Sequence, residues 1–289
     1  MLEDINGHTR LLAFIADPAE HTLSPRMHNY SFEKYGINYV YLAFQINQTT
    51  IEQAVNAIRT LDFRGVNLSM PNKQVVAKYL DRIDPVAELA NSVNTIVNDN
   101  GFLTGYTTDG RGFMNALRDR QVDYQGKTMT MLGCGGAGMP IAVQAALDGM
   151  EKIVIFNRVT DPQWEPAKRQ IALLNQKMKC QIELVDLADQ TYLKSSIENS
   201  QILCNATSVG MGKLADLSLV NDPSWFHSDM VVVDAVYEPR ETKLMRIAES
   251  AGVEHVFNGL ELLIQQGAES FKLWTGHEMP IDEVRNLLN

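Results

Sequence analysis

Along most of the chain, short apolar runs alternate with segments in which apolar residues recur at helical spacing. Apolar runs occupy residues 11–16, 40–46 and 63–69, and helical patterns occupy residues 25–36, 49–61 and 72–80. A short apolar run bounded by turn residues predicts a buried strand, whereas a period near 3.6 predicts an amphipathic helix. This β-α-β-α-β order favours a parallel sheet covered by helices, so the first hundred or so residues are predicted to form an α/β domain.

Residues 92–106 predict two extended runs joined by an Asn-Asp-Asn-Gly turn, and a second α/β series begins near Gly105 to Gly112. Its predicted strands lie at residues 127–133, 152–158, 180–187, 202–207 and 230–237. Residues 260–276 predict a long helix with no strand after it, which we expect to pack back on the first domain. We therefore predict a first domain of residues 1–105 completed by 260–289, and a second domain of residues 106–259.

The charge balance narrows the classes of partner. The chain has 25 Lys and Arg against 35 Asp and Glu, for a net charge of −10, which argues against nucleic acid or an anionic membrane as the main partner. No stretch approaches the ~18 apolar residues of a membrane span, and the acidic start MLEDING is unlike a signal peptide. Cys134, Cys180 and Cys204 show no metal-binding spacing, and an odd number cannot all pair, so we expect a reducing cytoplasm.

The segment LGCGGAGM places Gly133, Gly135, Gly136 and Gly138 between a predicted strand and a predicted helix. Glycines at such a turn allow a close approach to a pyrophosphate, which then lies on the helix N-terminus. The spacing is close to the dinucleotide-binding fingerprint, and the strand and helix around it supply the required context. The alternative is a glycine-rich turn without a ligand. Cys134 is interpreted as a small space-filling residue, because no His or second thiol lies nearby in the sequence.

About 20 residues after a fingerprint of this kind, an acid is typical of NAD and an arginine of NADP. Here the sequence FNRVTD supplies both, as Arg158 and Asp161. Asp161 would repel a 2′-phosphate, so the segment favours NAD slightly over NADP and leaves the use of both open. The alternative is that Arg158 and Asp161 only pair with each other at the surface.

Candidate catalytic residues follow two of the predicted strands of the first domain. Ser69 ends the predicted strand at 63–69, and Lys73 follows at the start of the predicted helix over 72–80. A lysine at the positive end of a helix is electrostatically unfavourable, which favours a functional role and a lowered pKa. An ordinary surface lysine is the alternative. Asp109 opens another predicted helix and is either a simple N-cap or a carboxylate facing Lys73, while Asn94 offers a neutral amide.

The stretch HTLSPRMHN has two hydroxyls one residue apart. Ser24 followed by Pro25 predicts a helix cap, with proline at the first helical position. A helix N-terminus is also an anion site, so Thr22 and Ser24 together are predicted to bind an anion without an arginine. We interpret His28 and Asn29 as structural residues.

With these residues in view, the chain resembles the shikimate dehydrogenase family, and most of all its quinate/shikimate dehydrogenase branch. The family pattern S-x-S-P-x-x-H-N is matched by TLSPRMHN, and N-V-[TS]-x-P-x-K by NLSMPNK. Further matches, in the family's order, are SVNTI, TTDG, GCGGAG, the Asn157-Arg158 pair, NATSVGM, VYEP and QGAESFKLWTG.

The resemblance implies a two-domain α/β fold, with an N-terminal substrate-binding domain, a Rossmann-like dinucleotide-binding domain and a C-terminal helix packed back on the first domain. It implies reversible NAD(P)-dependent oxidation of shikimate to 3-dehydroshikimate, and of quinate to 3-dehydroquinate, within aromatic amino acid biosynthesis. Lys73 and Asp109 would be the catalytic pair, with no metal, and Thr22 and Ser24 would hold the substrate carboxylate. The other substrate-binding residues it implies are Ser69, Asn94, Tyr237 and Gln266, besides Asp109. Its cofactor residues are Gly133, Cys134, Gly135, Gly136, Ala137, Gly138, Asn157, Arg158, Thr160, Asp161, Ser208, Ala235, Val236 and Gly259. A monomer and a homodimer both stay open.

Three positions depart from the family pattern: Thr22 replaces a serine, Thr107 replaces an asparagine and Glu261 replaces a glycine. The methyl of Thr22 would crowd the carboxylate pocket, the loss of an amide at Thr107 would affect the loop, and Glu261 would lie near the nicotinamide. Two alternatives to the dehydrogenase therefore stand: a specialised paralogue acting on a related cyclitol carboxylate, or a ligand-binding sensor on the same scaffold.

Overall fold

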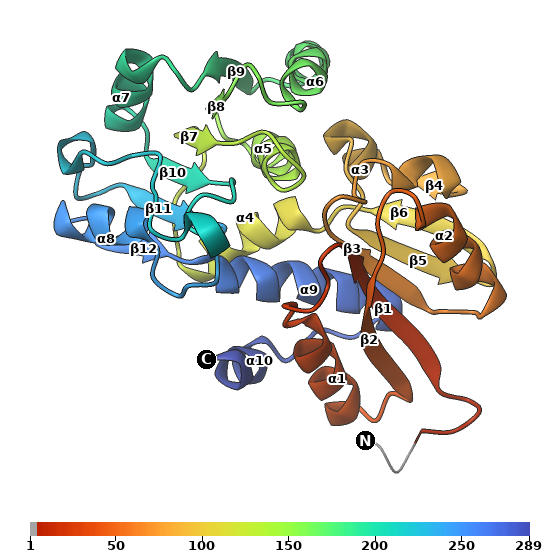
Figure 1. Ribbon diagram of the computed structural model, residues 1–289. Coiled ribbons are helices and arrows are strands. Elements are labelled where there is room, and N and C mark those ends of the chain that lie inside the picture. The colour runs from red at the N-terminus through yellow and green to blue at the C-terminus, as the bar shows by residue number, and fades with distance from the viewer. Residues whose placement is uncertain (1–4) are drawn as a thin grey trace. The chain divides into compact units, whose positions relative to one another are not determined.

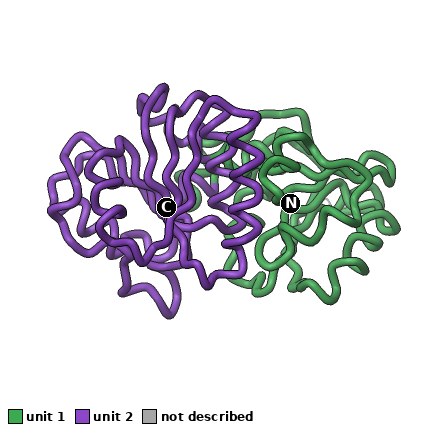
Figure 2. The backbone as a smooth tube through the Cα atoms, turned by 90° about the horizontal axis from the view of Figure 1, so that it is seen from above, with its two compact units in different colours: residues 1–112, 264–289 green, residues 113–263 purple. Residues whose placement is uncertain are grey.

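The protein, examined as a computed structural model that describes residues 5–289, contains two six-stranded sheets with helices packed around them (Figure 1). The start of the acidic segment MLEDING, at residues 1–4, lies outside the described residues. The chain divides into two compact units (Figure 2): unit 1 comprises residues 1–112 and 264–289, and unit 2 comprises residues 113–263. No helix in the described part of the chain is long and apolar enough to cross a membrane.

Unit 1 is built on a mostly parallel sheet with the strand order β2-β1-β3-β5-β6-β4. Its strands are β1 (Arg10–Ala16), β2 (Tyr39–Gln45), β3 (Gly65–Leu68), β4 (Arg82–Ile83), β5 (Thr95–Asp99) and β6 (Phe102–Tyr106). Within this sheet β5 runs antiparallel to both neighbours, as its hairpin turn to β6 requires. The start of β5 therefore lies at the same end of the sheet as the carboxyl ends of β3 and β6.

The helices of unit 1 cover both faces of this sheet. They are α1 (Ser24–Lys34), α2 (Ile51–Thr60), α3 (Pro85–Ala90), α10 (Ile281–Leu288), the 3₁₀ turn η2 (Val76–Tyr79) and parts of α4 (Asp109–Asp119) and α9 (Gly259–Thr275). Ile51, Val55 and Ile58 of α2 pack on the sheet in one buried cluster. On α9, the indole of Trp274 donates to the Ile96 carbonyl of β5 at 2.9 Å. The C-terminal segment thus belongs to the core of unit 1, as the sequence predicts.

Unit 2 is an all-parallel sheet with the strand order β12-β11-β10-β7-β8-β9. Its strands are β7 (Thr128–Leu132), β8 (Lys152–Asn157), β9 (Gln181–Asp186), β10 (Ile202–Asn205), β11 (Val231–Asp234) and β12 (His255–Phe257), and its helices include α5 (Gly138–Leu147), α6 (Trp164–Lys177), α7 (Gln190–Glu198) and α8 (Lys243–Ser250). Counted from β7, this is the doubly wound order 3-2-1-4-5-6 of dinucleotide-binding sheets. Ligands in such sheets bind where the strand order reverses, which here is between the carboxyl ends of β7 and β10.

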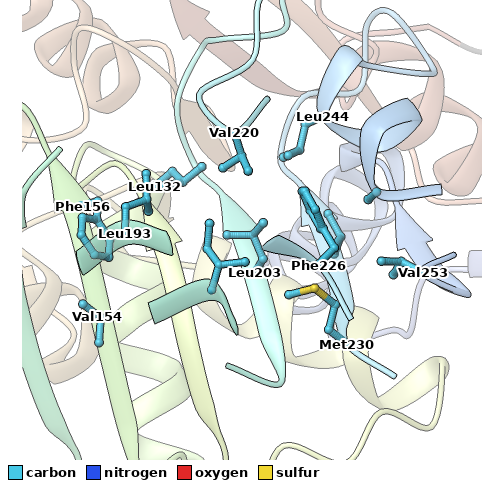
Figure 3. Close-up of a cluster of buried hydrophobic side chains, with 13 residues drawn as sticks. Leu132, Val154, Phe156, Leu193, Leu203, Val220, Phe226, Met230, Leu244 and Val253 are labelled. Carbon is cyan, nitrogen blue, oxygen red and sulfur yellow. The ribbon is translucent and has the colours of Figure 1, made fainter. Parts of the chain in front are cut away.

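The core of unit 2 gathers apolar side chains from one face of this sheet and the helices over it (Figure 3). Leu132, Phe156 and Leu203 come from adjacent strands, and each is at most 1% exposed. Burying one side chain of this size stabilises a protein by about 1.5–3 kcal/mol. The cluster therefore fixes the strand ends from which the glycine loop and its neighbours extend.

The predicted order of elements is confirmed, with two kinds of difference. Short or late elements were not predicted: β4, α3, α8, β12 and α10. The predicted helix over 72–80 is wrong, because the chain forms successive turns there and then the 3₁₀ turn η2. The Lys73 carbonyl accepts from the Val93 amide at 2.8 Å instead of from the next helical turn, so an α-helix cannot begin at that position.

Candidate active site

Lys73 and Asp109 form a buried ion pair beside the carboxyl ends of β3 and β6. Lys73 Nζ lies 2.7 Å from Asp109 Oδ2, and both side chains are 10% exposed. Lys73 comes from the turns after β3, and Asp109 is the first residue of α4, just after β6. The predicted contact between these residues is confirmed. The argument from a helix N-terminus at Lys73 is wrong, since no α-helix begins there.

Asn94 joins this pair from the start of β5. Its Nδ2 donates to Asp109 Oδ1 at 2.9 Å and to Thr108 Oγ1 at 2.9 Å, and its Oδ1 accepts from the Thr108 amide at 2.8 Å. One carboxylate oxygen of Asp109 thus faces an ammonium and the other faces a neutral amide. Gln266 on α9 completes the group, with its Oε1 3.4 Å from Asn94 Nδ2.

Behind these residues lies a buried polar shell that the sequence analysis missed. The Ser270 hydroxyl lies 2.8 Å from Thr95 Oγ1 and 3.2 Å from Thr108 Oγ1, and it accepts from Asn67 Nδ2 at 3.0 Å. All four side chains are at most 4% exposed. Two signals were available in the sequence: Asn67 interrupts an apolar strand, and Ser270 lies one helical turn after Gln266. The shell holds Asn94 and Thr108 in fixed orientations, because nearly every donor has its acceptor within the chain.

Thr22 and Ser24 lie together at the start of α1, but not as predicted. The helix begins at Ser24, so the cap role proposed for Ser24 is wrong. Instead Thr22 Oγ1 accepts from the Ser24 amide at 3.2 Å and donates to Ser24 Oγ at 3.1 Å. Ser24 also bonds the hydroxyl of Tyr41, whose pKa is raised well above its usual value by burial. Tyr41 in turn donates to Asn67 Oδ1 at 2.7 Å, which connects this hydroxyl pair to the polar shell.

His28 and Asn29 have structural contacts, in line with their interpretation. Asn29 Oδ1 accepts from the Tyr41 amide at 2.8 Å, and its Nδ2 donates to the Tyr41 carbonyl at 2.9 Å. The His28 ring is fully buried and stacks on Tyr41, with ring centroids 4.5 Å apart. Neither ring nitrogen has a hydrogen-bond partner among the described residues, and burial lowers the pKa of His28 to about 3. His28 is therefore neutral at physiological pH.

Ser69 lies just after β3, where its amide donates to the Ile15 carbonyl at 3.1 Å and its carbonyl accepts from the Asn72 amide at 2.9 Å. The turn that carries Lys73 is thus tied to β1 on one side and, through the Lys73 carbonyl, to Val93 on the other. Ser69 itself is half-buried.

The glycine loop of unit 2 lies at the carboxyl end of β7, where the strand order reverses. Gly133 has φ +96°, a conformation that other residues rarely adopt, and a Cβ at Gly138 would come within 2.3 Å of the Gly133 carbonyl oxygen. A Cβ at Gly135 would instead meet open space. Cys134 is buried, and burial raises the pKa of its thiol to about 11, so it is no nucleophile. Ala137 is the residue before α5.

The segment after β8 carries the predicted ribose-binding residues. Asn157 ends the strand, and its Nδ2 is buried without a hydrogen-bond partner among the described residues. Arg158 is 70% exposed and lies 3.4 Å from Asp161, whose other oxygen accepts from the Gln163 amide at 2.8 Å. Thr160 is exposed between them. Arg158 and Asp161 therefore contact each other, with Arg158 at the surface.

The remaining predicted cofactor residues follow β10 and β11. Ser208 is exposed after β10, while Ala235, Val236 and Tyr237 follow β11, where burial raises the pKa of Tyr237. The amide of Gly259 donates to the Val236 carbonyl at 2.9 Å. Asp234 fixes these ends, because its carboxylate accepts from Asn205 Nδ2 at 2.9 Å, the Val236 amide at 3.0 Å and Thr242 Oγ1 at 2.7 Å.

The structure also shows where Thr107 and Glu261 lie, two of the three positions that depart from the family pattern. Thr107 is 5% exposed, and its hydroxyl has no hydrogen-bond partner among the described residues. The next two residues, Thr108 and Asp109, are held by hydrogen bonds with the Asn94 side chain. The loop therefore does not depend on a side-chain amide at position 107. Glu261 is buried in the first turn of α9, beside a cavity of about 10 Å³ that Leu117 and Phe257 also line. Within residues 5–289, no cluster of three or more His, Cys, Asp or Glu side chains is arranged to hold a metal.

Comparison with known proteins identifies the family to which this chain is similar. The shikimate dehydrogenase substrate binding domain model matches residues 14–96, and the shikimate 5′-dehydrogenase C-terminal domain model matches residues 259–288. The chain is 46% identical over its whole length to a shikimate dehydrogenase (NADP⁺) of Streptococcus uberis, of which it covers 98%. The chain belongs to the shikimate dehydrogenase family. This membership confirms the resemblance found in the sequence motifs.

Solved structures of this family share the fold. A shikimate 5-dehydrogenase of Listeria monocytogenes, solved with shikimate and NAD, has a TM-score of 0.93 at 44% identity, with 99% of this chain and 98% of that chain covered. A quinate dehydrogenase of Corynebacterium glutamicum, solved with NAD, has a TM-score of 0.85 at 26% identity, with 97% and 98% covered. The two-domain α/β fold expected for a shikimate dehydrogenase is confirmed, and its relatives are NAD(P)-dependent oxidoreductases. None of these relatives supports the sensor alternative.

Proposed function

We propose that the chain catalyses reversible oxidation of shikimate to 3-dehydroshikimate with NAD or NADP. The observation that carries this proposal is the buried Lys73–Asp109 pair, set 2.7 Å apart among neutral hydrogen-bonding side chains. The family supports it, since the S. uberis relative bears the name of this enzyme and the L. monocytogenes relative was solved with shikimate.

The chemistry divides between the chain and its cofactor. The cofactor, when bound, accepts the hydride from the carbinol carbon. The Lys73–Asp109 pair accepts the hydroxyl proton during oxidation and returns it during reduction. The positive charge that develops on Lys73 Nζ as it takes the proton stabilises the negative charge that develops on the substrate oxygen. Asn94 keeps Asp109 oriented toward Lys73 through its bond to Oδ1.

A hydroxylated ring acid also needs an anion site and neutral partners. We assign the carboxylate to Thr22 and Ser24, whose hydroxyls lie together at the N-terminus of α1, where the helix dipole favours an anion. Ser69, Asn94, Gln266 and Tyr237 are assigned to the ring hydroxyls, together with Asp109. In a chain of net charge −10, hydroxyls on a helix N-terminus bind an acid without an arginine.

The residues of unit 2 fit a dinucleotide. The open space at Gly135 leaves room for a pyrophosphate beside the start of α5, where the helix dipole favours an anion. The unpaired Nδ2 of Asn157 offers a donor at the end of β8. We therefore assign the glycine loop to the pyrophosphate, residues 157–161 to the adenosine ribose, and Ser208, Ala235–Tyr237 and Gly259 to the nicotinamide half.

We infer a slight preference for NAD over NADP. Asp161 lies 3.4 Å from Arg158 and offsets the positive charge that a 2′-phosphate would need. A carboxylate there also repels the phosphate itself while accepting hydrogen bonds from ribose hydroxyls. The names of the relatives leave the preference open, because the S. uberis protein is named for NADP⁺ and the L. monocytogenes structure holds NAD.

The test is a four-way assay that follows absorbance of the reduced nicotinamide. Shikimate and quinate are each offered with NAD and with NADP. We expect turnover with shikimate and weaker turnover with quinate, both faster with NAD. Absence of turnover in all four combinations would overturn the proposal.

Two further properties are proposed. We place the protein in the cytoplasm, because its three cysteines are buried free thiols, as a reducing compartment keeps them. We also propose that two copies associate as a homodimer, since the edge strand β2 of the unit 1 sheet has no charged residue and exposes Leu42 and Phe44.

A further inference from the structure

Tyr41 of β2 lies between the two parts of the proposed site in unit 1. Its side chain is fully buried, and its ring stacks on His28 with the ring centroids 4.5 Å apart. The side chain of Asn29 bonds its backbone amide and carbonyl. Packing thus fixes the ring, which holds the tyrosine hydroxyl 2.7 Å from Asn67 Oδ1.

The orientation of the Asn67 amide sets the direction of this bond. Asn67 Nδ2 lies 3.2 Å from the backbone carbonyl of Asn94, a group that only accepts, so the other end of the amide, Oδ1, faces Tyr41. An amide oxygen also only accepts, so Tyr41 gives its single proton to Asn67. The tyrosine oxygen is left as an acceptor toward Ser24.

The hydroxyls of Ser24 and Thr22 continue in the same direction. Burial raises the pKa of Tyr41, while the Ser24 hydroxyl, which donates to the tyrosine oxygen, lowers it. Because the Ser24 proton is used in this way, Ser24 Oγ accepts from Thr22 Oγ1, at 3.1 Å. Three hydroxyl protons therefore point from the start of α1 toward Asn67. We call this series, Thr22–Ser24–Tyr41–Asn67, the hydroxyl relay.

The inner end of the hydroxyl relay reaches Asp109. Asn67 Nδ2 donates to Thr95 Oγ1 and to Ser270 Oγ, both at 3.0 Å. Thr95 Oγ1 donates to Asn94 Oδ1 at 3.0 Å, and Asn94 Nδ2 donates to Asp109 Oδ1 at 2.9 Å. A continuous set of hydrogen bonds thus joins the proposed carboxylate site to the proposed catalytic pair.

We propose that Tyr41 is a positioning residue that couples recognition of the substrate carboxylate to the orientation of Asp109, which rests on the carboxylate site proposed at Thr22 and Ser24. A carboxylate only accepts hydrogen bonds, so the Ser24 hydroxyl turns from Tyr41 to the acid when the acid binds. Tyr41 therefore competes with the substrate for the Ser24 proton and weakens its binding. The same hydroxyl holds Asn67, and through it the shell that orients Asp109.

The first experiment uses Tyr41→Phe, which removes one oxygen and keeps the ring that stacks on His28. Shikimate binding is measured by calorimetry without cofactor, and turnover by absorbance of the reduced nicotinamide. The Kd for shikimate should fall about fivefold, the contribution of one hydrogen bond, because Ser24 no longer gives up a bond to Tyr41. The kcat should fall about tenfold, because Asn67 loses its donor and the reacting groups are held less firmly. Tighter binding with slower turnover does not follow from a loss of stability alone.

Tyr39→Phe is the matched control. It removes a phenol hydroxyl two residues earlier on β2, on the same face of the sheet but outside the hydroxyl relay, and should leave Kd and kcat unchanged. Circular dichroism checks the folding of both variants. An unchanged or raised Kd for Tyr41→Phe, or an unchanged kcat, overturns the proposal. A wild type that neither binds nor turns over shikimate overturns the proposed function as well, so the two failures are distinguishable.

The second experiment separates the two ends of the hydroxyl relay. Ser270→Ala removes a partner of Asn67 and leaves the bond between Ser24 and Tyr41 in place. Its kcat should fall several-fold while its Kd for shikimate stays at the wild-type value. An unchanged kcat would show that the shell does not transmit the orientation of Asn67 to Asp109.

The third experiment needs no variant. In the wild type, shikimate without cofactor should shift the side-chain amide resonances of Asn67, which is 4% exposed, because Ser24 releases Tyr41 and the next bond changes in strength. Shikimate has no aromatic ring, so ring currents do not contribute. The amide of Asn175, bonded to the Ile182 carbonyl in unit 2, is the internal control and should not shift. Unshifted Asn67 resonances at saturating shikimate overturn the proposal.

Discussion

The polar side chains around Lys73 in unit 1 and those that follow β7 and β8 in unit 2 are paired to different degrees within the chain. Around Lys73, the side chains of Asp109, Asn94 and Thr108 bond one another and the shell behind them. In unit 2, Asn157 Nδ2 is buried without a partner among the described residues, and Gly135 faces open space. The arrangement around Lys73 is thus preorganised by the chain itself, whereas the buried amide at the end of β8 is left unpaired by the described residues. Substitutions in unit 1 should therefore affect turnover and substrate, and those in unit 2 the cofactor.

The largest effect is expected at Lys73. Lys73→Met keeps the length of the side chain and removes the amine that exchanges the hydroxyl proton, so kcat should fall about 10³-fold. Binding of the cofactor, measured by fluorescence titration, should be unchanged because the glycine loop lies in unit 2. A loss of less than about tenfold would contradict the assignment of Lys73 as a catalytic residue.

The next largest effect concerns acid stability of unit 1. His28 has its pKa lowered from 6.5 to about 3, so the unfolded chain binds more protons between these values and stability falls as the pH falls. Relative to His28→Phe, the wild type should lose about 1.4 kcal/mol per pH unit through this window. The fluorescence of Trp274, whose ring lies 5.2 Å from His28, reports on unit 1 when Trp164 and Trp225 are replaced by Phe.

Identical pH dependence in the wild type and in His28→Phe would contradict this prediction.

Unit 2 contains a buried group, Asp234, whose pKa is raised rather than lowered. Burial raises the pKa of Asp234, so its contribution to stability is lost as the pH rises through that raised value.

A smaller effect is expected at the carboxylate site. Thr22→Val removes the hydroxyl beside Ser24, and the loss of one hydrogen bond to an anion should raise the KM for shikimate about tenfold. The KM for the cofactor should not change. Thr22→Ser is the matched control and should keep the wild-type KM or lower it. If Thr22→Val lowers only the melting temperature, the role of Thr22 is to stabilise the start of α1.

The smallest effect is expected at the ribose end of unit 2. Asp161→Ser removes a negative charge and frees Arg158, which is 70% exposed. A charge pair near the surface contributes at most about 1 kcal/mol. The ratio of kcat/KM for NADP to that for NAD should rise about fivefold, with the KM for shikimate unchanged. An unchanged ratio would show that Asp161 does not influence the choice of cofactor.

The sequence predicted the layers and the main site because those depend on local patterns. Periodicity marks the strands and helices, and glycine spacing marks the loop after β7. The two extended runs of residues 92–106 and the turn between them were predicted, and Asn94 was named there as a neutral amide. The polar shell was missed, because Ser270 and Asn67 are brought together only by the packing of α9 on β3 and β5. The helix at Lys73 was predicted wrongly because the Lys73 carbonyl bonds Val93, a contact about twenty residues away that no local pattern shows.

The division of unit 1 into two chain segments has a consequence for biosynthesis. Unit 2 is continuous from residue 113 to 263, so all its strands have emerged before the second segment of unit 1 is made. Domains tend to fold as units during synthesis, from the N-terminus onward. Gln266, Ser270 and Trp274 reach the unit 1 core only with that second segment. The nascent chain thus holds a folded unit 2 before the Lys73–Asp109 pair has a complete shell, and the proposed active site is assembled only with the second segment of unit 1.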